Sequence, residues 1–140
     1  MNKVATILTA VLIAGFAAVK MSDVPAPAPL NWMDEQEFRE RLVNYQCFKQ
    51  TLEETLVSLG KREINLKEAH ARVCGAARRF QPDYLEHLTQ VEPGATDAER
   101  VAHNLVGHLR SVAELEPRAR ALEIELHAIR HESAAVRGAH

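Results

Sequence analysis

The sequence has few of the residues and motifs on which enzyme active sites are built. Only 5% of its 140 residues are aromatic, and only two are cysteines. These two do not form a CxxC motif, which excludes a dithiol redox site and a zinc knuckle. The sequence also has no serine nucleophile elbow, Walker loop, Rossmann glycine set or HExxH helix. We therefore expect no catalytic residues and no enzyme activity.

The chain has no excess of charge of either sign, since its formal net charge is -2. This near balance gives no support for a nucleic-acid binder. The charged fraction of 26% is ordinary for a globular domain, which argues against bulk disorder. A chain of this length allows one domain with a modest core, filled mostly by leucine, valine and alanine.

The longest hydrophobic run covers residues 4–19 and is flanked by Lys3 and Lys20. Its length lies between that of a signal-peptide core and that of a full membrane span. We expect residues 1–21 to be a signal anchor; the alternative is a signal peptide cleaved after Ala17. The anchor predicts a single pass through a bacterial inner membrane, with the domain on the periplasmic side. Cleavage would instead secrete the domain to the periplasm.

A linker follows at residues 22–33, where Pro25, Pro27 and Pro29 alternate with alanines. Alternating prolines favour an extended and stiff polyproline conformation. We expect this linker to hold the rest of the chain away from a membrane surface.

Residues 34–137 are predicted to form a helical module, with residues 138–140 as a tail. Asp34, Asn65 and Thr96 are typical helix caps, and Pro82 suits a first helical turn. Pro117 lies where the apolar pattern keeps its phase, so we expect a kink there and no hairpin. The predicted helices cover about 34–59, 65–80, 83–90 and 97–136.

The predicted helices at both ends of the module carry apolar residues on alternating four- and three-residue steps, the spacing of a coiled-coil seam. The fold class expected is therefore all-α, a small antiparallel bundle of long amphipathic helices with coiled-coil-like seams. Apolar surface that the bundle leaves uncovered would bind a protein partner or a second copy. The predicted interaction seam consists of Phe38, Leu42, Tyr45, Leu52, Leu56, Val101, Leu105, Val112, Leu122, Leu126 and Ile129.

His127 and His131 form the best metal candidate. A spacing of four places both imidazoles on one helical face, and Glu123 lies one turn earlier as a third ligand. Zinc or nickel would suit such a set, although a solvated polar face is the commoner outcome and we expect no cofactor. Cys47 and Cys74 fit either one disulfide in an oxidising compartment or two free thiols in a reducing one.

The middle of the chain resembles a group of bacterial proteins. The segments Ile64 to Ala69 leading to Phe80, and Pro93 to Arg100 leading to Val106, are similar to small uncharacterised proteins of planctomycete bacteria. The resemblance covers a third to a half of the chain. It implies a bacterial protein, and it carries no functional residue because no activity is assigned to that family.

Two hypotheses follow. The first is a membrane-tethered, non-enzymatic helical module that acts through protein contacts as an accessory or adaptor subunit. The alternative is a periplasmic metal- or stress-sensing helical protein that uses His127 and His131.

Overall fold

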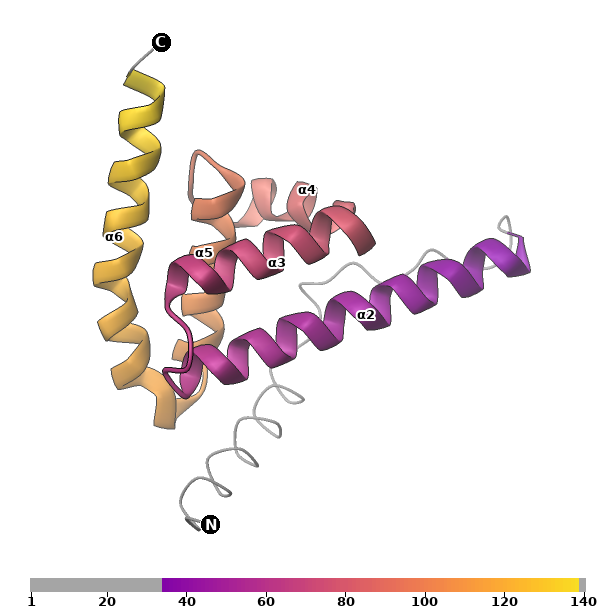
Figure 1. The fold of residues 1–140 in the computed structure, drawn as a ribbon, viewed down its shortest axis with the longest axis horizontal. Helices are drawn as coiled ribbons and strands as arrows, with labels where there is room; N and C mark the ends of the chain where they lie inside the picture. The colour runs from indigo at the N-terminus through magenta and orange to yellow at the C-terminus, as the bar shows by residue number, and fades with distance from the viewer. Residues whose placement is uncertain (1–33, 139–140) are drawn as a thin grey trace.

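The computed structural model describes residues 34–138, which contain helices and no strand (Figure 1). The all-α prediction is therefore confirmed, whereas the expected membrane segment 1–21 and linker 22–33 lie outside the described residues. Among the helices of residues 34–138, we find none with the length and hydrophobicity of a membrane span. The helices are α2 (Glu35–Gly60), α3 (Leu66–Phe80), α4 (Pro82–Val91), α5 (Asp97–Arg110) and α6 (Glu116–Gly138), with a 3-10 turn at Ala113–Leu115 before α6.

The bundle consists of two antiparallel helix pairs that cross each other. Figure 1 shows α3 running back along α2, and α6 running back along α5. Helix α3 joins the pairs because it packs on both α2 and α5. Glu125 of α6 also reaches the start of α3, where its carboxylate accepts a hydrogen bond of 2.7 Å from the Leu66 amide.

The helix starts follow the caps expected from the sequence. At α3 the Asn65 side chain accepts from the Glu68 amide, and the Glu68 carboxylate accepts from the Asn65 amide. At α2 the Asp34 side chain accepts from the Gln36 amide, and at α5 the Thr96 side chain accepts from the Glu99 amide. These bonds satisfy amides that no helical carbonyl reaches, so the local sequence sets where α2, α3 and α5 begin.

The prediction of one kinked helix over residues 97–136 is wrong. Helix α5 ends at Arg110, Val112 is extended, and α6 begins after the 3-10 turn. Pro117 lies in the first turn of α6, where its missing amide hydrogen breaks no helical bond. The apolar pattern keeps its phase because both helices face the same core, so phase alone could not distinguish a hairpin from a kink.

The expected long seam along α2 is also not seen. The core begins at Phe48, and no residue from 35 to 47 is buried. Helix α3 ends while α2 continues well beyond it (Figure 1). We call residues 35–47 the projecting half of α2. The described residues therefore form a short bundle in which no second helix lies along the whole of α2.

Candidate functional site

Most of the predicted seam lies inside the bundle's own core. These side chains are at most 7% exposed, so within the described chain they offer no surface to a partner. They are Leu52, Leu56, Val101, Leu105, Val112, Leu122, Leu126 and Ile129. The rest of the seam lies on the projecting half of α2.

The projecting half carries the remaining seam residues on a helix face that the bundle does not bury. Leu42 is 37% exposed, while Phe38 and Tyr45 are half-buried. Tyr45 packs against the edge of the core, and Phe38 lies nearly two turns further out. The end of α6 also extends past its neighbours and carries the exposed Val136, but residues 35–47 combine several apolar side chains on such an extension, and they are our candidate interaction surface.

Ion pairs within the helix support the projecting half. Arg39 contacts the Glu35 carboxylate at 2.5 Å, and Arg41 contacts the Glu37 carboxylate at 2.9 Å. Each pair joins residues four apart, the spacing that brings side chains together on a helix surface. Exposed pairs of this kind contribute only about 0.3–0.5 kcal/mol each. They favour the helical conformation of residues 35–41 slightly and leave the apolar face uncovered.

A shallow hollow between α5 and α6 is the second candidate site. Arg110 of α5 pairs across it with the Glu123 carboxylate of α6. Its lining carries charges of both signs and only two apolar side chains, so it suits neither a hydrophobic ligand nor a strongly charged one. The lining residues are His103, Val106, Gly107, Arg110, Glu123, Leu126, His127 and Arg130.

The hollow brings together only part of the predicted metal set. Glu123 and His127 line it, whereas His131 is exposed one turn further along α6. A metal at Glu123 would first have to displace Arg110 from the carboxylate. Among residues 34–138, no group of three or more histidine, cysteine, aspartate or glutamate side chains lies close enough to hold a metal ion. Metal binding by His127, His131 and Glu123 stays a prediction that no contact in the structure favours.

A partly buried polar network, not anticipated from the sequence, connects α4 to α5. The Glu92 carboxylate lies 2.9 Å from His103 Nδ1 and accepts a hydrogen bond of 2.9 Å from the Asn104 amide group. Asn104 Oδ1 in turn accepts a hydrogen bond of 2.9 Å from the Tyr84 hydroxyl. Each group is satisfied by the next, and no nucleophile lies among them. The network therefore holds the α4–α5 turn in place. Polar residues at such helix and turn positions are common in helical proteins, so the sequence alone does not reveal the network.

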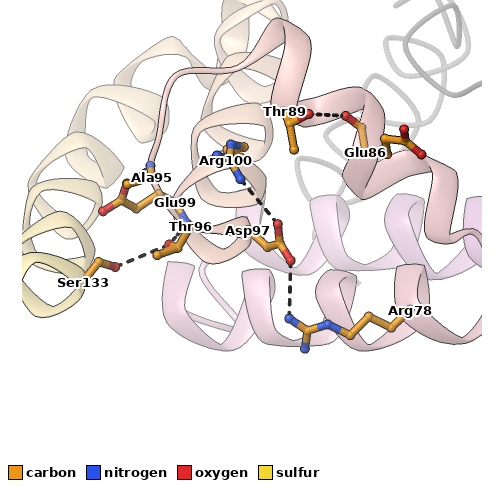
Figure 2. Close-up of polar contacts among 9 residues, drawn as sticks. All are labelled: Arg78, Glu86, Thr89, Ala95, Thr96, Asp97, Glu99, Arg100 and Ser133. Atoms are coloured by element: carbon orange, nitrogen blue, oxygen red, sulfur yellow. Dashed lines mark hydrogen bonds and ion pairs between the residues drawn. The ribbon is translucent and has the colours of Figure 1, made fainter. Parts of the chain in front are cut away.

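Figure 2 shows a second network, at the start of α5. The Glu99 carboxylate accepts a hydrogen bond of 2.6 Å from the Ala95 amide, and Glu99 is only 4% exposed. Thr96 lies 3.5 Å from Ser133 of α6, and Asp97 lies 3.7 Å from Arg78 of α3. These contacts join α5 to both neighbouring helices, so this cluster is structural.

The cysteines are free thiols in the structure, so the disulfide alternative is not seen. Cys47 is half-buried at the end of the projecting half, and Cys74 is buried in α3. Burial raises the pKa of the Cys74 thiol to about 11. The reactive thiolate of Cys74 is therefore scarce near neutral pH.

We expect the two cysteines to differ strongly in alkylation. Iodoacetamide at pH 8 should modify Cys47 in the folded protein and leave Cys74 unmodified until the chain is unfolded in urea. Mass spectrometry of tryptic peptides with light and heavy reagent, added before and after urea, measures both sites in one sample. Equal modification of Cys74 before unfolding would mean that α3 is not packed as described.

Comparison with protein-family models, curated proteins and solved structures finds no match to this chain. The resemblance to planctomycete proteins therefore stays a prediction from the sequence.

Proposed function

We propose that this protein is a non-enzymatic helical interaction module that binds its protein partner through the projecting half of α2. One observation carries the proposal: the apolar face of residues 35–47 continues past the bundle and is not buried by it. Exposed apolar groups on a helix that extends beyond its own core are typical of a binding surface. The bundle then serves as the support that fixes one end of this helix.

The proposal includes the membrane tether expected from residues 4–19. The projecting half follows the proline-rich linker directly in the sequence, so a tethered chain would present this part of α2 first. The linker would act as a spacer, and the bundle would lie on the periplasmic side of a bacterial inner membrane. An accessory or adaptor subunit fits this arrangement because its task is to hold a partner at a surface.

Fewer structural observations support the metal- or stress-sensing alternative. It requires His127 and His131 to act with a carboxylate, and Glu123 already pairs with Arg110.

Photo-cross-linking in the full-length chain tests the proposed function. A benzoylphenylalanine at Leu42, in cells that make the protein, should form a discrete adduct with another polypeptide chain. Ile124 provides the control position, because it is 77% exposed and apolar but lies on the bundle, on the outer face of α6. Phe38→Asp should abolish the Leu42 adduct because it places a charge in the contact face. The proposal fails if Leu42 gives no adduct, or gives the same products as Ile124.

A further inference from the structure

Helix α3 lies beside the second half of α2, and no helix of the described residues lies beside the projecting half. Helix α3 covers the apolar face of α2 from the Gly60 end and stops at Phe80, which packs at the edge of the core. Beyond that end the same face continues with Phe38 and Leu42 (Figure 1). A helix that extended the line of α3, antiparallel to α2, would cover these side chains.

We propose that this helix is the projecting half of α2 from a second copy of the chain. The proposal rests on the proposed function and names the partner as the same protein. The two projecting halves pack antiparallel, about a two-fold axis near Glu40. Each then continues the line of the other copy's α3, and one patch serves both sides of the interface, as two-fold symmetry requires.

The spacing of the apolar residues fits this register. With the axis near Glu40, Phe38 of each copy lies opposite Leu42 of the other, and Tyr45 lies opposite the aliphatic part of Glu35. These positions follow the four–three step on which antiparallel helices interlock. The pairing buries all three apolar residues of the seam that the bundle leaves outside its core.

Charge supports the same orientation. The first two turns of α2 with their cap carry four carboxylates and two arginines, whereas the last turn of α3 carries Arg78 and Arg79. Arg79 lies 5.0 Å from the centre of the Phe80 ring and pairs with no carboxylate within residues 34–138. Antiparallel packing brings the acidic start of α2 to this basic end. It also places the positive end of one helix dipole beside the negative end of another.

A parallel pairing satisfies neither condition. Helix α3 covers the same face of α2 from Phe48 onward, so two parallel copies would bring their α3 helices into one place. Parallel packing would also set the two acidic helix starts side by side, where like charges repel.

The interface is short. About eleven residues of each helix overlap, which is roughly 16 Å of helix. An interface of this size belongs to the weak class, so the free chains should associate poorly in dilute solution. Attachment to one membrane would raise the effective concentration and favour pairing.

Mixed cysteine cross-linking in the full-length chain tests the orientation. One chain carries Glu35→Cys and the other Arg79→Cys, both with Cys47→Ser, and the two are co-expressed and oxidised in membranes. Because each chain carries one new cysteine, no cross-link within a chain can imitate the result. Gln50→Cys with Arg79→Cys is the matched control, since Gln50 is exposed on the opposite face of α2.

Antiparallel pairing predicts that the mixed dimer of Glu35→Cys and Arg79→Cys is the main product and that the control pair gives none. Adding Leu42→Asp to both chains should reduce the mixed dimer about tenfold or more. Leu42 lies outside the core, so unchanged circular dichroism would show that the bundle still folds.

Two results would overturn the proposal. Cross-linking only between two Glu35→Cys chains would mean parallel pairing. Absence of any cross-linked dimer would mean that a second copy is not the partner. If the photo-cross-linker at Leu42 then captures a different polypeptide, the proposed function survives and only the self-pairing fails.

Discussion

Phe48→Ala is expected to lower the free energy of unfolding by about 3–5 kcal/mol, the range for removing a buried aromatic ring. Phe48 is fully buried, and its ring centre lies 4.7 Å from that of Tyr84, which is 1% exposed. The pair connects α2 to α4, so its loss leaves a cavity between two helices. Against a typical stability of about 5–15 kcal/mol, the variant would be marginal at growth temperature. Urea unfolding followed by circular dichroism at 222 nm measures the change.

Leu42→Ala on the same helix is the matched control for Phe48→Ala. Leu42 is 37% exposed and lies on the projecting half, so we expect a change within about 0.5 kcal/mol in dilute protein. The contrast between the two variants tests where the core of the bundle begins along α2. Similar losses at both positions would mean that the projecting half is packed in a way that the structure does not show.

Gly94→Ala is expected to destabilise the protein by about 2–4 kcal/mol, combining backbone strain with a steric clash. Gly94 has a φ of +147°, a conformation that side chains strongly disfavour. An added Cβ would also lie 2.9 Å from the Glu99 Cβ and 3.1 Å from the Arg100 nitrogen. Both atoms belong to the first turn of α5 and cannot move away without disturbing the Glu99–Ala95 contact. Thermal unfolding should show a lower midpoint, by roughly 4 °C or more per kcal/mol.

Gly75→Ala is expected to change stability in the opposite direction. Gly75 lies inside α3, is exposed, and has no atom within 4 Å of an added Cβ. Alanine there should stabilise the helix by about 0.5–1 kcal/mol. A loss of stability at Gly75, or none at Gly94, would contradict the description of the backbone at that position.

The starts of α2, α3 and α5 could be predicted from the sequence because each depends on a few adjacent residues. Asn65 and Glu68 satisfy each other's amides across three residues, and no distant contact is needed for that. The break after Arg110 could not be predicted in this way. No glycine or asparagine marks it, and Val112 takes an extended conformation that its side chain accepts anywhere. Only the packing of α6 back onto α5 requires a turn there.

The candidate site could be predicted only in part. The apolar pattern runs from Phe38 to Leu59 with Lys49 as its one polar position, so the sequence indicated the face correctly and not its buried length. That length depends on where α3 ends, which the sequence of α2 does not determine. Glu99 and Asn104 show the same limit, since both are 4% exposed although their side chains are polar. Their burial depends on partners that only the fold brings near.

The order of the helix pairs along the chain has a consequence for synthesis. Each pair joins helices that are neighbours or near neighbours in the sequence, so contacts form soon after both helices have emerged from the ribosome. The α2–α3 pair can close once residue 80 has emerged, and the α5–α6 hairpin then docks onto α3. As the helix pairs form one after the other, the nascent chain covers its apolar surface in steps. Residues 35–47 are the first described helical segment to be made, and no later helix buries them.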